Sequence, residues 1–185
     1  MRKAPFLSID MDGLSEKVLL QGGEDRVRHH DIHSGDDLDA LTYAEWQKIL
    51  DVNLTGPMLC TKAVAPVMQR HGAGRIVNIA SIAGLSPSGS SIAYAVSKAG
   101  LIHLTRCMAV GLAPTILVNC IAPGYLEGTR ATANLDPDYQ VQARMGALLK
   151  RAADKDDIAE QVVAFCRTDS ITGQTLAIDA GRVFH

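Results

Sequence analysis

The sequence predicts an α/β fold in which helices cover a parallel β-sheet. Short apolar segments of strand length recur along the chain, and most of them precede segments whose apolar residues repeat at helical spacing. Strands that alternate with helices form parallel sheets. The composition agrees, because 47% of the 185 residues are hydrophobic and 21% are charged, as in compact soluble domains. No repeat or linker divides the chain, so we expect one domain over residues 1–185.

The charge balance excludes several classes of partner. The 18 basic and 20 acidic residues give a net charge of -2, which provides no basic surface for nucleic acid or an anionic membrane. No apolar run approaches the roughly 18 residues of a membrane-spanning helix, and Asp10 and Asp12 interrupt any signal-peptide core. We therefore expect a cytoplasmic protein whose partner is a small molecule.

The four cysteines are not expected to carry chemistry. They are scattered through apolar stretches with no close pair, which favours buried reduced thiols over disulfides or a zinc site. They are Cys60, Cys107, Cys120 and Cys166.

The first part of the chain contains two candidate strands and the start of a long helix. Phe6–Asp10 and Arg26–Ile32 are predicted strands, and Leu14–Gly23 is a predicted short helix between them. A longer helix begins at a capping box in which Thr42 is followed three residues later by Glu45. Leu41 can pack on Trp46 there, and the helix is predicted to run past Asn53 toward Gln69.

The rest of the chain alternates strands and helices. A predicted strand over Arg75–Ala80 leads through a loop of small residues to a helix over Tyr94–Ala113. A second apolar strand over Ile116–Ile121 is closed by Pro123-Gly124. The amphipathic helix and final strand that follow are predicted over Asp156–Cys166 and Gln174–Asp179.

Three polar residues are predicted to meet at one edge of the sheet. In a parallel sheet, ligands bind beyond the carboxyl ends of the strands, and Ser81 directly follows such an end. Tyr94 begins the next helix, and Lys98 lies one helical turn later on the same face. A phenol with a pKa of about 10 is a poor acid-base catalyst at neutral pH, and a fixed positive charge favours its phenolate. Ser81 could then orient a carbonyl or alcohol oxygen while Tyr94 gives or takes its proton.

Five segments, read in order, resemble the short-chain dehydrogenase/reductase family. Several independent motifs in register are more specific than a Tyr-Lys pair alone, and the resemblance covers roughly residues 41–185. The segments are Asp51-Val52-Asn53-Leu54-Thr55-Gly56, Gly74-Arg75-Ile76-Val77-Asn78-Ile79-Ala80-Ser81, Tyr94-Ala95-Val96-Ser97-Lys98-Ala99, Val118-Asn119-Cys120-Ile121-Ala122-Pro123-Gly124 and Thr172-Gly173-Gln174-Thr175-Leu176.

The resemblance implies a Rossmann-like, three-layer fold and an NAD(P)-dependent oxidoreductase. Such an enzyme moves a hydride between a nicotinamide cofactor and an alcohol or carbonyl substrate. Tyr94 is then the acid-base, and Ser81 holds the substrate oxygen. Lys98 binds the nicotinamide ribose and lowers the pKa of Tyr94. Asn53 holds a water that links Lys98 to solvent.

The same resemblance implies further contacts and partners. Pro123 and Gly124 lie beside the nicotinamide, and residues 125–150 match the family's variable substrate lid. A homodimer or homotetramer is expected, because relatives commonly associate. The lid hints at a partly apolar pocket, but steroid, sugar, acyl chain and pterin substrates all remain open.

Residues 1–40 depart from the family pattern. Members open with a strand and a T-G-x-x-x-G-x-G turn that receives the cofactor pyrophosphate. Gly13, Gly22 and Gly23 do not reproduce this spacing, and no N-N-A-G segment precedes Asn53. We therefore expect a fold that is apparently truncated in its N-terminal half, with residues 1–40 as a divergent or incomplete dinucleotide-binding part and 41–185 as the catalytic part.

Two alignments compete for residues 1–40. The first matches Phe6–Asp10 and Arg26–Ile32 to the family's second and third strands, so that Asp10 binds the adenosine ribose and favours NAD over NADP, and Asp31 contacts the adenine. The second places Val27–Ile32 where the family has V-N-N-A-G-I. We prefer the first, because it explains more residues. It implies that two central strands of the family's sheet are missing. The remaining strands would then pair directly with one another, or another chain would fill the gap.

Structural roles compete with each functional assignment. Asn53 could satisfy backbone groups at a bend, Ser81 could cap a turn, and Asn78 is expected to be a hydrogen-bonded structural residue. A metal site is not expected in the cluster His29-His30-Asp31-Ile32-His33. Neighbouring residues of a strand face opposite sides, so only His29, Asp31 and His33 could converge, and no other ligand lies at suitable spacing.

Two functions remain open at the level of sequence. The first is the NAD(P)-dependent oxidoreductase, motivated by Asn53, Ser81, Tyr94 and Lys98. The second is a catalytically inactive protein that acts in assembly or binding, motivated by the missing glycine-rich turn. The retained motifs favour the enzyme.

Overall fold

The computed structural model describes residues 36–129, 132 and 135–184. Their architecture is α/β, as expected, with three parallel strands in the order β1-β2-β3. The strands are β1 (Gly74–Ile79), β2 (Ile116–Pro123) and β3 (Thr175–Ile178). The strands and helix expected before residue 33 lie outside the described residues.

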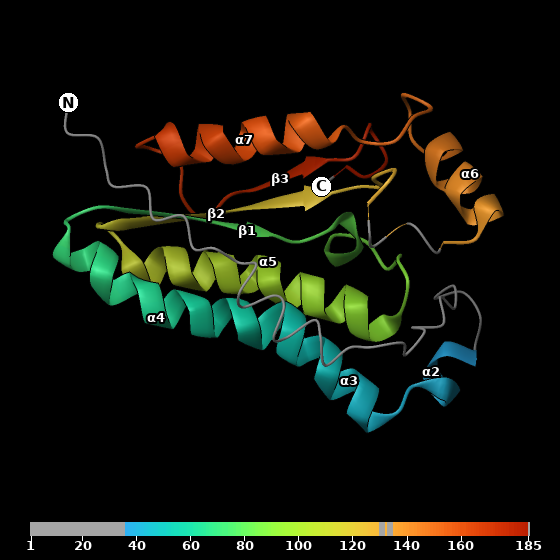
Figure 1. The fold of residues 1–185 in the computed structure, drawn as a ribbon, viewed down its shortest axis with the longest axis horizontal. Helices are drawn as coiled ribbons and strands as arrows, with labels where there is room; N and C mark the ends of the chain where they lie inside the picture. Colours follow the sequence, from blue (N-terminus) through green and yellow to red (C-terminus); the bar gives the residue numbers. More distant parts are fainter. Residues whose placement is uncertain (1–35, 130–131, 133–134, 185) are drawn as a thin grey trace.

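Helices lie on both faces of this sheet (Figure 1). Helices α4 (Gly56–Arg70) and α5 (Ile92–Leu112) cover one face, and α7 (Lys155–Arg167) covers the other. β2 is the central strand and its apolar residues are buried on both sides, as in parallel sheets that are covered twice. Ile116, Val118 and Cys120 pack toward α4 and α5, together with Leu101 of α5.

The long helix expected from Thr42 is present but not uniform. The capping box is formed, since Thr42 and Glu45 each accept a backbone N–H of the other, and α3 runs over Tyr43–Leu50. A π-helical turn over Asp51–Thr55 then joins α3 to α4, and the Gly56 N–H donates to the Asp51 carbonyl five residues back. The short α2 (Asp36–Ala40) precedes this helix. Single π turns of this kind occur often at functional sites.

The remaining helix lies within the stretch expected to be a lid. α6 spans Pro137–Met145, with Asp136 as its N-cap and Pro137 at its first turn.

Helix α5 is capped by Ser91, which directly precedes it and whose hydroxyl accepts the Tyr94 N–H at 3.2 Å. Among the described residues, no helix is long and apolar enough to cross a membrane.

Two expectations about side chains have different outcomes. Asn78 is a structural residue, as expected, because its amide donates to Thr105 Oγ1 at 2.9 Å inside the core. The cysteines are reduced, as expected, but the expected burial holds fully only for Cys120. Cys60 and Cys166 are partly buried and Cys107 is exposed, because apolar neighbours along a helix do not decide which of its faces is covered.

Candidate functional site

The predicted site residues meet at the carboxyl ends of the strands. Ser81 follows β1, Pro123 ends β2, and Tyr94 lies in the first turn of α5. In Figure 1 the strands point toward the end of the sheet where α5 begins, and α6 and the C-terminus lie at that same end. This is where ligands bind in open parallel sheets.

Ser81 has both a capping role and a contact with Tyr94. It is the N-cap of a short 3-10 turn over Ile82–Gly84, and its Oγ accepts the Ala83 N–H at 3.2 Å. Its hydroxyl also lies near enough to the Tyr94 phenol to lower the pKa of that phenol by hydrogen bonding. The structural role weighed for Ser81 and its position beside Tyr94 are therefore compatible.

Gly84 allows this turn to approach α5 closely. A Cβ at Gly84 would lie 2.6 Å from the Lys98 carbonyl carbon and 2.7 Å from the Ala99 nitrogen, which no backbone can tolerate without moving. Gly84 therefore fixes the separation between the Ser81 turn and the helix that carries Tyr94 and Lys98. The sequence analysis did not single out Gly84, because the contact is with a residue far along the chain.

Lys98 lies one turn after Tyr94, as the spacing predicts, and makes two contacts. Its Nζ donates to the Ile79 carbonyl at 3.0 Å, at the end of β1. The same atom lies 5.6 Å from the centre of the Tyr94 ring, within the range of a cation–π interaction. The ammonium is thus held beside the phenol by a backbone acceptor of the sheet.

The electrostatics of the pair differ from the expectation. Burial raises the pKa of Tyr94 above 10.0, against a lowering by the hydrogen bond to Ser81 and a further raising by Tyr139. Burial also lowers the pKa of Lys98 below 10.5. The sequence predicts that Lys98 lowers the pKa of Tyr94, but desolvation of the phenol outweighs any such effect here.

Asn53 is connected to the same helix through a buried serine. It lies in the π-helical turn, and its Nδ2 donates to Ser97 Oγ at 3.1 Å. Ser97 is fully buried and donates in turn to the Tyr94 carbonyl at 2.7 Å. Asn53 thus has a structural contact, but with a side chain of α5 instead of the backbone groups at a bend that the sequence suggested. Its role in a water relay stays a prediction.

Pro123 and Gly124 lie where β2 ends. Pro123 is buried, and the Gly124 N–H donates to the Ile178 carbonyl of β3 at 2.9 Å. A Cβ at Gly124 would lie 2.7 Å from Asp179 Cα. Gly124 is thus required by the close packing of β2 on the end of β3, and its contact with a nicotinamide stays a prediction.

Helix α6 lies at the same end of the sheet as the site (Figure 1). The phenol of its Tyr139 raises the pKa of Tyr94 electrostatically, as the smallest of three contributions. The preceding loop is tied to α6, since the Tyr125 hydroxyl donates to Gln140 Oε1 at 2.9 Å and Arg144 forms an ion pair with Glu127. The sequence analysis identified this stretch only as a lid.

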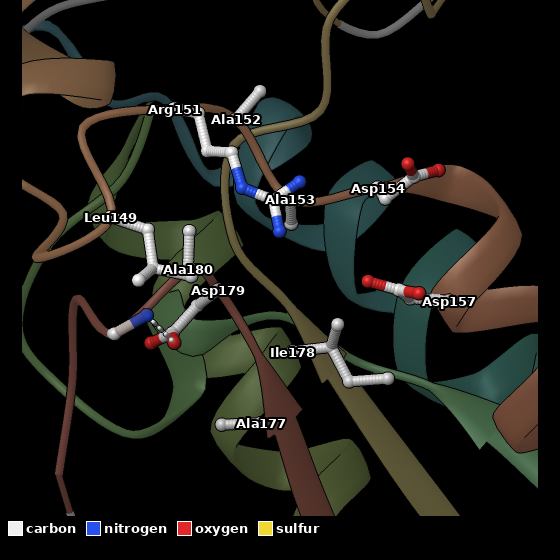
Figure 2. A pocket seen from close by; sticks show the side chains of 11 residues that line it. Leu149, Arg151, Ala152, Ala153, Asp154, Asp157, Ala177, Ile178, Asp179 and Ala180 are labelled. Carbon is white, nitrogen blue, oxygen red and sulfur yellow. Dashed lines mark hydrogen bonds between the residues drawn. The ribbon is translucent and has the colours of Figure 1, made fainter.

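A separate pocket of about 250 Å³ lies beyond the end of β3 (Figure 2). Figure 2 shows the Arg151 side chain directed between Asp179 and the carboxylates of Asp154 and Asp157. None of the predicted site residues lines this pocket, so it is distinct from the Tyr94 site.

Two predicted cofactor residues are not among those described. Asp10 and Asp31 lie outside the described residues, as does the histidine cluster around residue 30. Within residues 36–129, 132 and 135–184, no group of three or more potential metal ligands comes together.

Comparison with known proteins gives a consistent set of relatives. Residues 28–182 match a protein-family model described as enoyl-(acyl carrier protein) reductase. Dehydrogenase/reductase SDR family member 4 from Homo sapiens is 37% identical over 145 residues, which are 76% of this chain and 52% of that protein. A short-chain dehydrogenase/reductase homologue from Bacillus subtilis is 38% identical over 130 residues, which are 70% of this chain and 98% of that protein.

A solved structure extends the comparison to three dimensions. The gluconate 5-dehydrogenase from Burkholderia cenocepacia, in complex with NADP and tartrate, has a TM-score of 0.72 and 29% sequence identity. The match covers 78% of this chain and 58% of that one. The chain thus spans little more than half the length of several of the proteins it resembles.

Proposed function

Because the chain belongs to the short-chain dehydrogenase/reductase family, we propose that it is an NAD(P)-dependent oxidoreductase that acts on an alcohol or carbonyl substrate. The observation that carries this proposal is the Ser81–Tyr94–Lys98 arrangement at the carboxyl end of the sheet. A serine hydroxyl, a phenol and an ammonium that lie close together can form a proton-transfer site.

The donor set suits the nicotinamide-ribose half of the cofactor. Lys98 presents a partly buried ammonium whose Nζ can donate to ribose hydroxyls, and Pro123 and Gly124 form the adjacent end of β2. The proposed adenosine contacts, Asp10 and Asp31, lie in the part of the chain not described. When bound, the nicotinamide supplies or accepts the hydride. Of the two cofactors, we favour NAD on the proposed role of Asp10.

The chain's own residues then handle the proton and the substrate oxygen. In the reductive direction, the Ser81 Oγ orients the carbonyl oxygen and Tyr94 donates its phenolic proton to that oxygen as the carbon–hydrogen bond forms. Lys98 stabilises the resulting phenolate. In the oxidative direction, Tyr94 takes the hydroxyl proton. The raised pKa of Tyr94 keeps the phenol protonated at neutral pH, which is the form that donates a proton in the reductive direction.

Cofactor binding is the first test. Purified chain of verified mass is titrated with NADH and NADPH while the fluorescence of the reduced nicotinamide is followed. Saturable binding that weakens in Lys98→Ala supports the proposal, and tighter binding of NADH supports Asp10. Absence of binding at millimolar concentrations of both cofactors overturns it.

Turnover provides the second test. Tyr94→Phe keeps the ring and removes the acidic proton, so activity against a panel of carbonyl compounds should fall by about 10²–10⁴-fold. Tyr43→Phe is the matched control, because Tyr43 is 79% exposed at the start of α3 and is not one of the residues assigned to the site. Activity that survives in Tyr94→Phe with an unchanged pH profile rejects the assigned role.

A second candidate function is assembly with another copy of this chain. The observation that favours it is a groove of about 330 Å³ on the α4–α5 side. Its lining is largely apolar, and the exposed thiol of Cys107 lies in it. Val110, one helical turn later, is 82% exposed. Such a patch on a single chain often marks an interface.

Sedimentation equilibrium tests this assembly. A second copy on the groove predicts a dimer or larger species that Cys107→Glu dissociates. Val163→Glu is the matched control, because Val163 is partly exposed on α7, on the opposite face of the sheet. A monomer at all concentrations rejects the candidate.

A further inference from the structure

The turn that follows β3 contacts the end of helix α6. Arg182 in this turn donates from Nη1 to the Ala143 carbonyl at 2.9 Å and to the Gln142 carbonyl at 3.4 Å. Both acceptors belong to the last turn of α6, where carbonyl groups commonly lack helical partners, although the Gln142 carbonyl also accepts the Gly146 N–H at 2.8 Å. A guanidinium at that position also interacts favourably with the helix dipole.

Asp179 shapes the turn that presents Arg182. Its buried carboxylate accepts the Gly181 N–H at 2.9 Å and the Val183 N–H at 2.8 Å, on either side of Arg182. Ala180 and Gly181 both have positive φ, at 56° and 78°. The side chain of Arg182 therefore projects from a backbone loop that is fixed by charge-assisted hydrogen bonds.

The backbone of the same turn is bonded to the residues after α6. Leu148 N–H donates to the Gly181 carbonyl at 3.1 Å, and Leu149 N–H donates to the Ala180 carbonyl at 3.0 Å. Figure 2 shows Leu149 and Ala180 next to each other. Helix α6 is thus attached to the turn at its last carbonyls and again just beyond its end.

Gly146 leaves the space that Arg182 occupies. A Cβ at Gly146 would meet the Arg182 guanidinium, with its central carbon at 3.1 Å. Gly146 has an ordinary helical conformation, with φ of -74°, so its backbone does not require glycine. The neighbouring side chain is what a larger residue there would displace.

Apolar burial does little to hold α6 in place. Val141 and Met145 are 49% and 54% exposed, and the buried side chains nearby are the small Ala143 and Ala147. Polar contacts must therefore carry much of the attachment.

We propose that the turn Asp179–Phe184 is a strap that holds α6 against the Tyr94 site, with Arg182 as its anchor. Arg182 is a positioning residue, because it acts through α6 and touches neither Tyr94 nor Ser81. Helix α6 lies at the end of the sheet where α5 begins (Figure 1), so the strap positions the helix that would border a substrate bound there. This consequence for substrate rests on the proposed function, whereas the attachment itself does not.

Hydrogen exchange followed by mass spectrometry tests the attachment on the full chain. Arg182→Ala should increase the exchange rate of the α6 amides by about five- to tenfold, the effect of losing charge-assisted hydrogen bonds, while β2 amides are unchanged. Arg182→Lys keeps the charge but loses the planar fork, and should give an intermediate increase. Arg70→Ala, an exposed arginine in the last turn of α4, changes the net charge equally and should leave α6 unaffected.

A double-variant cycle tests the pairing of Gly146 with Arg182. Gly146→Ala should expel the guanidinium and speed α6 exchange to a similar extent as Arg182→Ala. The double variant should exchange no faster than either single variant, because the contact is already lost. Independent, multiplicative effects would show that Gly146 does not make room for Arg182.

Two results would overturn the strap. One is exchange in α6 of Arg182→Ala that equals that of Arg70→Ala. The other is an equal increase in amide exchange of α6 and β2 in both Arg182→Ala and Arg182→Lys, which would mean that Arg182 contributes to global stability.

If turnover is found, Arg182→Ala should raise KM more than it lowers kcat, because Ser81 and Tyr94 are positioned by β1 and α5. If no substrate is turned over, the exchange data still decide on the strap.

Discussion

The two sides of the Tyr94 site are built by different physics. On the α5 side, Ala93 and Ser97 are fully buried and Leu101 is 2% exposed, and the helix packs against the sheet and the Ser81 turn. On the α6 side, the larger apolar side chains are exposed, and the helix is attached by Arg182, by the Glu127–Arg144 ion pair and by backbone hydrogen bonds. One side is held by packing and the other by polar contacts.

This difference suits the two tasks of such a site. The groups proposed to move a proton need a fixed separation, and close packing with a glycine contact provides it. The side proposed to face the substrate has few buried apolar contacts, and segments of that kind open locally at low cost. Substitutions on the α5 side should therefore change the free energy of unfolding more than substitutions on the α6 side.

The largest difference is expected from leucine truncations. Leu101→Ala removes a buried side chain from the α5 side and should lower the free energy of unfolding by about 3 kcal/mol. Leu148→Ala, just after α6, removes a side chain that is 66% exposed and should change it by less than about 0.5 kcal/mol. Urea denaturation of both variants measures this. Equal losses would contradict the proposed division.

A methyl group at Gly84 should have the next largest effect. Gly84→Ala places it against the α5 backbone and should lower the free energy of unfolding by about 2 kcal/mol. Gly111→Ala is the control, because a Cβ at Gly111, near the end of α5, meets nothing within 4 Å. Denaturation gives the stability, and a titration of the Tyr94 phenol followed by NMR reports whether its bond to Ser81 is lost, since that loss should raise its pKa further.

A stabilising substitution is expected in the strap. Ala180 holds a left-handed conformation, with φ of 56°, that costs an L-residue about 1 kcal/mol relative to glycine. Ala180→Gly should therefore raise the unfolding free energy by up to about 1 kcal/mol. A thermal melt that shows lower stability would mean that the Ala180 methyl makes a contact worth more than this strain.

The smallest expected effect depends on pH. Because the pKa of Lys98 is lowered in the folded chain, protonated Lys98 opposes folding at neutral pH, and this cost disappears as the pH rises through its folded pKa toward 10.5. The stability of the native protein should therefore improve relative to Lys98→Met as the pH rises from neutral toward 10.5. Parallel denaturation curves at several pH values measure the difference, and a constant difference would refute the lowered pKa.

Much of the sheet and the α5 side followed from local sequence. Apolar runs located the three strands within one or two residues, and the capping box located the start of α3. The spacing of Tyr94 and Lys98 placed them on one face of α5, and both helix N-caps at Ser91 and Asp136 have side chains typical of that role.

The features that the sequence did not predict depend on contacts between separate segments of the chain. Gly84 meets Lys98, and Arg182 meets α6, through tertiary packing that no local pattern encodes. The raised pKa of Tyr94 depends on how far the phenol is buried. The expected burial of Cys107 failed because apolar neighbours along a helix do not decide which face meets the sheet. The roles of Asp10 and Asp31 stay predictions.

The π-helical turn has a consequence for insertions and deletions. It winds one more residue into the helix than an α-helix would, between Asp51 and Gly56. The turn holds this extra residue with little change in the relative rotation of α3 and α4, so a chain one residue shorter here could form an unbroken α-helix that keeps α3 in its present orientation. Such a deletion would instead change the local position of Asn53 and its hydrogen bond to Ser97. The extra residue therefore serves the geometry of the turn itself, and the packing of α3 does not require it.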